Sequence, residues 1–414
     1  MQKVKIAIAL WAAIFISAMH PAALAEQSKR PEGLTLEAFQ FGPVNRWTFS
    51  HMREVLPTIN IGRDTGRFLP LEQSARSVSD FSVSFQDSVQ AIDEIAGHQY
   101  IDGLLVIREG QIRFEKYYGH LREDLPHLMN SISKSVVALV AGKLAGQGVI
   151  ELDKPVSHYV PALADSGWGP DALRTLLDMR DGSDYTEDYA NFSTTFRLQD
   201  CAIGWTDADY CPKNGPRGLY EFLPTIGRNE EKLGKFSYRS GSTDVIGWVL
   251  EAATGQPLAE LISEYVWQPM GAEFDANITV DEGGFALADH GMSSTLRDLG
   301  RLGLLLLNGG KAFDEQVIPA GFVADLFGQA GDPEWPYPAD EGLAPYYRSF
   351  WWGEGNDGGD LSGYGIHGQF VRVVPEHQLV IAMYSTWPRA DGDSATHGWD
   401  ATAELMNAII SEFR

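Results

Sequence analysis

The sequence predicts an α+β fold in which both ends of the chain contribute strands to one antiparallel sheet. Apolar and polar residues alternate over 103–119 around Glu109-Gly110, the pattern of a two-stranded hairpin. Two more strand-like runs, 362–374 and 378–387, lie near the other end of the chain. The chain between them is mostly helical in pattern, so we expect the terminal strands to pair, with a helical insertion at about 150–310.

The first 25 residues predict a secretory signal peptide. Lys3 and Lys5 precede an apolar run over 6–18, and Ala23-Leu24-Ala25 is a small-x-small cleavage site. The apolar run is too short to span a bilayer. We therefore expect cleavage after Ala25 and a mature protein that is periplasmic or secreted, with no membrane insertion.

Residues 26–99 show no sustained periodicity, and we expect them to form a leading segment that packs on the main domain, residues 100–414. An apolar helix is predicted over 131–148, directly after the hairpin. Apolar residues also recur at helical spacing over 172–179, 243–253, 258–266, 295–308 and 402–413.

A stretch over 181–235 is rich in Gly, Asn, Asp and aromatic residues and holds the only two cysteines, Cys201 and Cys211. In an oxidising compartment these cysteines can pair across a short loop, so we expect a disulfide there. Connections this long are usually lids or binding loops. The sequence therefore predicts a stapled lid or binding loop.

Composition restricts the class of partner. The formal net charge is −24 at pH 7, which makes nucleic acid and anionic membranes poor partners. The sequence has no Cys/His cluster and no His-Glu-x-x-His motif, so we expect neither a metal nor another cofactor. A small-molecule substrate is the expected partner, and the sequence leaves the oligomeric state open.

Ser131-Ile-Ser-Lys134 is the only Ser-x-x-Lys in the chain and makes Ser131 a candidate nucleophile. Residues three apart share a helix face, so the Lys134 amine would stand beside the Ser131 hydroxyl. The helix N-terminus would also offer backbone N–H groups to a developing oxyanion. The alternative is an N-cap serine followed by a solvated lysine.

A serine nucleophile needs a base. The motif Gly-x-Ser-x-Gly is absent, which argues against an α/β-hydrolase, and no local signature supports a Ser-His-Asp triad. Another way to activate the serine pairs Lys134 with Tyr238, because a tyrosine beside a buried lysine can relay a proton. The glycines of 365–369 (GIHGQ) would let substrate approach a strand closely. The alternative for Tyr238 is a tyrosine whose hydroxyl caps a loop. The alternative for His367 is an ordinary hydrogen-bonded strand histidine.

Together these motifs resemble the serine β-lactamase and penicillin-binding-protein superfamily, in its class C-like branch. The resemblance rests on Ser131-x-x-Lys134, Tyr238-x-Ser240 and the strand motif around His367-Gly368, and it covers roughly residues 100–410. That branch includes family VIII carboxylesterases, D-amino-acid peptidases and 6-aminohexanoate-dimer hydrolases. The stretches most similar to the dimer hydrolases are Asn45-Arg-Trp47, Asp184-Tyr-Thr-Glu-Asp-Tyr189, Ile366-His-Gly-Gln369 and Ser385-Thr-Trp-Pro388.

The resemblance implies a β-lactamase-like fold and an exported serine hydrolase that cleaves an ester or linear amide through an acyl-enzyme at Ser131. Lys134 and Tyr238 would form the base pair, and Ser240 would complete their hydrogen-bond network. Backbone N–H groups of Ser131 and Gln369 would form the oxyanion hole.

The chain departs from lactamases at the strand motif Lys-Thr-Gly, whose first position here is Ile366, or His367 if the register slips by one. Ile366 would remove the cation that meets a β-lactam carboxylate, while Gly368 would keep the strand open to substrate. By the same resemblance Tyr189 would touch the scissile amide nitrogen, or would simply pack the lid. The alternatives are a β-lactamase, a D-alanyl-D-alanine carboxypeptidase, and a non-turnover penicillin-binding or sensor module whose covalent adduct persists.

Overall fold

The structure, a computed structural model, describes residues 29–329, 339, 344–354, 359–393 and 397–414. The predicted signal peptide, residues 1–25, lies outside the described residues. Contacts divide the chain into two units, Met1–Glu32 and Gly33–Arg414, and the fold and the site belong to the second. Among the described helices, none has the length and apolarity needed to cross a bilayer.

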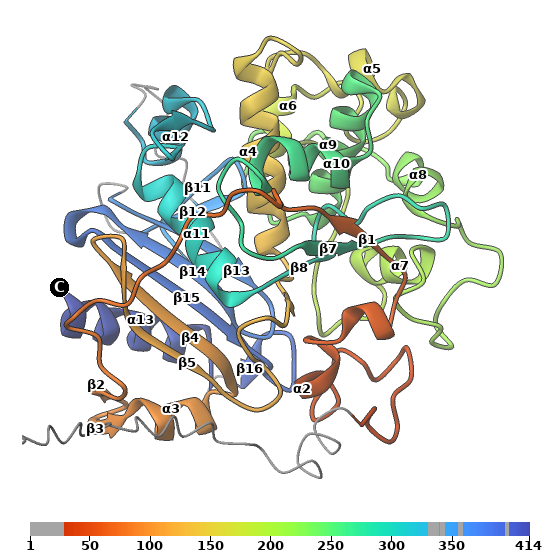
Figure 1. The fold of residues 1–414 in the computed structure, drawn as a ribbon. Helices are drawn as coiled ribbons and strands as arrows, with labels where there is room; N and C mark the ends of the chain where they lie inside the picture. Colours follow the sequence, from red (N-terminus) through yellow and green to blue (C-terminus); the bar gives the residue numbers. More distant parts are fainter. Residues whose placement is uncertain (1–28, 330–338, 340–343, 355–358, 394–396) are drawn as a thin grey trace, which may run out of the picture. The chain divides into compact units, whose positions relative to one another are not determined.

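The larger unit contains a seven-stranded antiparallel sheet (Figure 1). β4 (Ile101–Arg108) and β5 (Gln111–Tyr117) form the predicted hairpin at one edge. β4 also pairs with β15 (Leu379–Ser385), so strands from the two ends of the chain lie side by side, and the α+β prediction is confirmed. Beyond β15 the order continues through β14 (Gln369–Val374), β13 (Asp360–Gly365), β12 (Trp351–Glu354) and β11 (Tyr346–Arg348).

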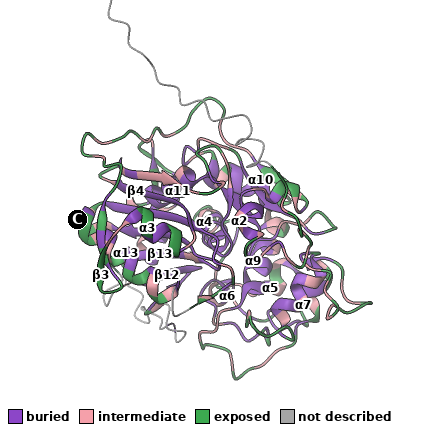
Figure 2. Ribbon diagram, turned by 90° about the horizontal axis from the view of Figure 1, so that it is seen from below, coloured by how far each residue is buried: buried purple, intermediate pink, exposed green. Residues whose placement is uncertain are grey.

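Helices cover both faces of this sheet, with buried residues concentrated between the layers (Figure 2). The predicted apolar helix is α4 (Ile132–Gly146), which begins one residue after Ser131. Another helix, α9 (Ser240–Thr254), begins two residues after Tyr238. The helices that matter most for the sheet and the site are α3 (Ile92–His98), α4 (Ile132–Gly146), α9 (Ser240–Thr254), α11 (Leu296–Leu307) and α13 (Trp399–Phe413).

Side chains of β4 alternate between two hydrophobic clusters, because successive residues of a strand point to opposite faces. Leu105 and Ile107 belong to the cluster that contains α4 and α11. Leu104 and Val106 belong to the cluster that contains α3 and α13. Both faces of β4 are therefore buried, which explains its continuous run of apolar residues.

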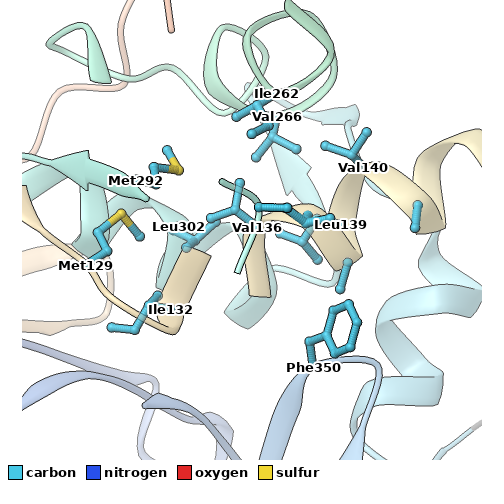
Figure 3. Packing of buried hydrophobic residues seen from close by; sticks show 14 of the residues in the cluster. Met129, Ile132, Val136, Leu139, Val140, Ile262, Val266, Met292, Leu302 and Phe350 are labelled. Atoms are coloured by element: carbon cyan, nitrogen blue, oxygen red, sulfur yellow. The ribbon is translucent and has the colours of Figure 1, made fainter. Parts of the chain in front are cut away.

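Nearly all residues of α4 are buried, including the polar Ser133, Lys134 and Ser135, so the helix packs against the core on every face. The side chains packed along it in Figure 3 include Ile132, Val136, Leu139, Val140, Ile262, Val266, Leu302 and Phe350. A helix held by its whole circumference keeps its N-terminus in a fixed place. Core packing therefore positions Ser131 and Lys134.

The region predicted as a helical insertion contains several short helices and part of a second sheet. In that sheet β1 (Thr58–Ile61) pairs with β7 (Ala276–Thr279), and β6 (His127–Leu128) pairs with β8 (Met292–Ser294). The leading segment is thus tied to the middle of the chain through β1. The other short elements are α2 (Asn45–Thr48), η1 (Met52–Glu54), β2 (Ser82–Phe85), β3 (Ser88–Ala91), α5 (Val156–Tyr159), η2 (Pro161–Leu163), α6 (Leu173–Leu177), α7 (Thr195–Ala202), α8 (Leu219–Phe222), η3 (Leu223–Thr225), α10 (Leu258–Ile262), η4 (Ser263–Trp267), β9 (Lys311–Ala312), β10 (Glu315–Gln316), α12 (Ala320–Leu326), η5 (Pro375–His377), β16 (Gly392–Asp393) and β17 (His397–Gly398).

The run over 362–374 is two strands, and its prediction as one strand was wrong. The chain reverses between β13 and β14, and Gly365 pairs with Gln369 across the turn. His367 has a φ of 63° and Gly368 a φ of 87°, a left-handed conformation that ends a strand. The residues predicted to lie inside a strand beside α4 therefore form a tight turn.

The stretch over 181–235 folds around α7 and α8. The predicted disulfide between Cys201 and Cys211 is present, with a Cα–Cα distance of 5.5 Å. Tyr189 and Glu187, from the start of this stretch, line the same cavity as Ser131. This stretch therefore forms part of the cavity wall, as expected for a binding loop.

Candidate active site

Ser131 and Lys134 make the contact that their spacing predicts. Ser131 is the N-cap residue of α4, and Lys134 stands one turn further along the helix. The Lys134 Nζ lies 2.8 Å from the Ser131 Oγ. Asn130, with a φ of 47°, turns the chain into the helix, and asparagine tolerates this left-handed conformation better than most residues.

Lys134 is buried, with 1% of its surface exposed. Its Nζ also donates a hydrogen bond of 2.8 Å to the backbone carbonyl of Asp289. Burial lowers the pKa of the Lys134 ammonium, against the opposing effect of the carboxylates of Asp289, Glu187 and Asp244. A lysine with a lowered pKa can accept a proton from a serine hydroxyl at neutral pH.

Tyr238 lies two residues before α9 and lines the same cavity as Ser131. Its ring centroid is 5.2 Å from the Lys134 Nζ, and the ring stacks on Trp352 at a centroid distance of 5.8 Å. The structure therefore brings the three residues of the predicted catalytic group together, from α4 and from the approach to α9.

Ser240 and Tyr189 are joined through Glu187. The Glu187 carboxylate accepts hydrogen bonds from the Ser240 amide at 2.7 Å, the Ser240 hydroxyl at 2.8 Å and the Tyr189 hydroxyl at 2.6 Å. Burial raises the pKa of Glu187, while Lys134 and these donors act in the opposite direction. Ser240 therefore positions an acid of the cavity wall through two hydrogen bonds.

The turn between β13 and β14 presents Ile366 to the cavity, whereas His367 points elsewhere. The Ile366 carbonyl accepts a hydrogen bond of 2.9 Å from Asn130 Nδ2, which ties the turn to the residue before Ser131. Gln369 is fully buried, and its side chain donates 2.7 Å to the Ser385 carbonyl. A Cβ on Gly368 would lie 2.6 Å from the Trp387 ring, so only glycine fits there.

His367 is buried behind the turn between β13 and β14 and contacts residues that do not line the cavity. It is 1% exposed, its Nδ1 lies 2.7 Å from the Trp387 carbonyl, and its ring makes an edge contact with Phe49. The same Trp387 carbonyl accepts 2.8 Å from Asn45 Nδ2 of the leading segment. His367 and Asn45 therefore anchor the turn from behind, as in the alternative in which His367 is an ordinary hydrogen-bonded histidine.

Acid should destabilise the protein through His367. Burial lowers the pKa of His367 to about 4, below its ordinary value of 6.5. Between these values the unfolded chain binds a proton that the folded chain does not, so stability falls as the pH falls through this window. We expect this histidine to cost up to about 3 kcal/mol by pH 4.

Denaturant unfolding at pH 7.5 and pH 4 measures this cost. His367→Asn tolerates the left-handed backbone and does not titrate. The wild type should lose about 3 kcal/mol more than this variant between the two pH values. Equal losses in the two proteins would show that His367 is solvated and titrates normally.

The cavity beside Ser131 has a volume of about 140 Å³. Its wall combines rings and carboxylates, and its lining residues are Ser131, Glu187, Tyr189, Tyr238, Trp352, Tyr364, Ile366, Asp391 and Trp399. None of these lining residues is a cation. The wall suits an uncharged or cationic group better than an anion.

A buried polar network lies behind Lys134. The Asp289 amide donates 3.2 Å to Asp244, and Gln199 Nε2 donates 2.8 Å to Asp244 and 3.2 Å to Asp289. Burial and the neighbouring Asp289 raise the pKa of Asp244 well above its ordinary value. This network orients the Asp289 peptide, whose carbonyl receives the Lys134 amine. It also connects α7, through Gln199, to the residues that hold Lys134.

Several residues of the site carry no role in the sequence interpretation. Glu187 stands inside a stretch recognised for its resemblance, and its three hydrogen bonds give it a role. Asn130 directly precedes Ser131, and its residue type was the available signal, because asparagine tolerates a left-handed backbone before a helix. Asp289 and Asp391 carry no local signal, because only the tertiary fold brings them to the site.

Comparison with known proteins supplies the family. A family model described as beta-lactamase matches residues 89–404. The chain belongs to the beta-lactamase family. It is 36% identical over 365 residues to a 6-aminohexanoate-dimer hydrolase of Paenarthrobacter ureafaciens, covering 86% of this chain and 89% of the relative. It is 28% identical over 206 residues to esterase EstB of Burkholderia gladioli, covering 45% and 49% of the two chains.

Solved structures agree with this assignment. A Bacillus anthracis protein described as a candidate 6-aminohexanoate-dimer hydrolase superposes with a TM-score of 0.81 at 25% identity, over 93% of this chain and 97% of that one. A class C beta-lactamase from Rhodobacter sphaeroides, at 18% identity, shares the fold with a TM-score of 0.54, over 77% and 98% of the two chains. This member of the beta-lactamase family is thus a serine hydrolase of the amidase and esterase type with a β-lactamase-like fold.

Proposed function

We propose that this protein is an exported hydrolase that cleaves an ester or a linear amide through an acyl-enzyme at Ser131. The observation that carries the proposal is the 2.8 Å contact between the Ser131 Oγ and the buried Lys134 Nζ, on a cavity that Tyr238 also lines. A serine, a lysine with a lowered pKa and a tyrosine on one small cavity are the parts that acyl transfer needs.

In the acylation step the Ser131 oxygen attacks the substrate carbonyl while its proton moves to the pair formed by Lys134 and Tyr238. Collapse of the tetrahedral intermediate breaks the bond to the leaving alcohol or amine, which takes that proton from the same pair. The Asp289 carbonyl, at 2.8 Å from the Lys134 Nζ, holds the amine in place during both transfers.

Deacylation uses the same groups with water as the nucleophile. The pair removes a proton from water as its oxygen attacks the acyl carbon, and it returns a proton to Ser131 as the acid product leaves. The cavity retains an acyl group between Tyr238, Trp352 and Ile366. A site that lets water in at this step turns over, whereas one that excludes water stalls.

The oxyanion hole would combine the amide of Ser131 with one from the turn. The Ser131 amide donates to no other group within the described part of the chain, and it lies at the N-terminus of α4. For the second donor, Ile366 lines the cavity, whereas Gln369 is paired with Gly365 in the ladder. The geometry therefore favours the Ile366 amide over the predicted Gln369 amide.

Substrate preference should follow from Ile366. A penicillin carboxylate would find an isoleucine where lactamases have lysine, and Glu187 and Asp391 nearby would repel it. The lost charge-assisted hydrogen bond is worth roughly 1.5–3 kcal/mol, or about 10–150-fold in kcat/KM. The named activities of the two sequence relatives, on a linear amide dimer and on esters, support the same preference.

Steady-state kinetics on nitrocefin, p-nitrophenyl butyrate and short linear amides test the function. We expect the ester or a linear amide to show the highest kcat/KM. If nitrocefin exceeded them all, the protein would be a β-lactamase. Protein recovered from the periplasmic fraction should be used, because its intact mass also tests the predicted cleavage after Ala25. The disulfide supports export to an oxidising compartment.

A further inference from the structure

The leading segment contacts the chain next to both backbone donors of the proposed oxyanion hole. One donor, the Ser131 amide, follows β6, and the other, the Ile366 amide, lies in the turn between β13 and β14. The Ile366 amide, like the Ser131 amide, donates to no other group in the described part of the chain. The two amides come from distant parts of the sequence, so tertiary contacts must set the distance between them.

On the side of the turn the contact is made by Asn45 of α2. Its Nδ2 donates a hydrogen bond of 2.8 Å to the Trp387 carbonyl, which also accepts one of 2.7 Å from His367 Nδ1. The His367 amide donates 2.8 Å to the Ala390 carbonyl, and the Trp387 amide donates 3.1 Å to the His367 carbonyl. Because His367 directly follows Ile366, the contacts that fix His367 also fix the Ile366 peptide.

On the side of β6 the contact is made by Phe49, the residue that follows α2. Its carbonyl accepts a hydrogen bond of 2.7 Å from the Leu128 amide, shortly before Ser131. Its ring makes edge contacts with His127 of β6 at a centroid distance of 5.8 Å and with His367 of the turn at 5.2 Å. Phe49 is buried, so its ring fills the space between β6 and the turn.

Asn45 is buried with one of its polar atoms unpaired. The residue is fully buried, and its Oδ1 has no hydrogen-bond partner among the described residues. An unpaired buried acceptor costs stability, so a leucine of similar size would serve at least as well if packing were the only requirement. What the amide provides and leucine lacks is the Nδ2 donor to the Trp387 carbonyl.

We propose that Asn45 and Phe49 form a clamp that sets the distance between the two oxyanion donors, and that Asn45 is a positioning residue for the hydrolytic reaction. The family model matches residues 89–404, so the clamp lies outside that region of the chain. The proposal rests on the proposed function, because it takes Ser131 as the nucleophile. A displaced donor weakens binding of the transition state more than binding of the substrate, because the oxyanion forms only in the transition state.

Asn45→Leu tests the clamp, because it removes the donor and the unpaired acceptor together. We expect kcat on p-nitrophenyl butyrate to fall about 10–50-fold while KM stays within about two-fold. Affinity for the trifluoromethyl ketone that corresponds to the butyryl ester should fall by a similar factor, since its adduct with Ser131 places an oxyanion in the hole. The unfolding midpoint should stay close to that of the wild type, whereas a purely structural role would lower it and leave kcat unchanged.

Thr48→Val is the matched control. Thr48 is buried on the same helix, and its hydroxyl donates 2.5 Å to the Phe39 carbonyl within the leading segment. This variant should have a lower unfolding midpoint and the kcat and ketone affinity of the wild type. An equal loss of kcat in Thr48→Val would show a general loosening of the leading segment and would overturn the role of Asn45.

Asn45→Ala serves as the second variant if the leucine variant does not fold. A folded Asn45 variant whose kcat stays within about two-fold of the wild type, or in which only KM changes, would overturn the clamp. An unchanged affinity for the ketone would do the same. The proposed function is tested separately by Ser131→Ala, and it would stand if Ser131 were required for turnover and Asn45 were not.

Discussion

Ser131→Ala is expected to abolish turnover and covalent labelling by a fluorophosphonate. Ser131 is the cavity-lining hydroxyl that contacts the Lys134 amine, at 2.8 Å. A nucleophile that acts as part of a unit carries nearly the whole rate, so the loss should be on the order of 10⁴-fold or more. Kinetics on p-nitrophenyl butyrate and gel detection of the label measure it.

Ser135→Ala is the matched control for this variant. Ser135 stands one turn further along α4, and its hydroxyl donates 2.8 Å to the Phe350 carbonyl instead of facing the cavity. Its loss should reduce stability by about 1 kcal/mol and leave labelling in place. Labelling that survives Ser131→Ala would move the nucleophile to another residue.

Lys134→Ala and Tyr238→Phe should each lower kcat by at least about 10²-fold, the usual scale for removal of a general base. Lys134→Ala leaves the Ser131 hydroxyl without the amine that takes its proton. Tyr238→Phe keeps the ring and its stacking on Trp352 and removes only the hydroxyl. Far-UV circular dichroism and the unfolding midpoint should show that both variants fold.

Lys143→Ala and Tyr117→Phe are the controls. Lys143 lies on the same helix but donates to the Val317 carbonyl, and the Tyr117 hydroxyl donates to Glu115. Both should retain activity within a few-fold of the wild type. A Lys134 or Tyr238 variant that behaved like these controls would remove that residue from the base pair.

Much of the fold could be predicted because its signals are local. The hairpin at 103–119 and the helix after Ser131 follow from periodicity, and both are present as β4, β5 and α4. The reversal at His367 was missed, because apolar residues continue on both sides of it and hide the break. The motif Gly-x-His-Gly was visible, but its left-handed backbone is a property of the folded turn.

The contacts of the site likewise include some that follow from local sequence and others that only the tertiary fold creates. The contact between Ser131 and Lys134 follows from helix geometry alone. Tyr238 could be proposed as their partner, but its position beside Lys134 could not be derived from spacing. The Asp289 carbonyl lies 155 residues from Lys134 in the chain and joins it through tertiary packing. Backbone acceptors of this kind leave no signature in a sequence, because any residue type can supply them.

Mass spectrometry of acid-quenched protein during turnover of p-nitrophenyl butyrate tests the central claim most directly. The account predicts a butyryl group on the peptide that contains Ser131, appearing within the first turnovers and disappearing once substrate is exhausted. An adduct on another residue would contradict the acyl-enzyme at Ser131. An adduct on Ser131 that persists after substrate is gone would contradict turnover and identify a non-turnover penicillin-binding or sensor module.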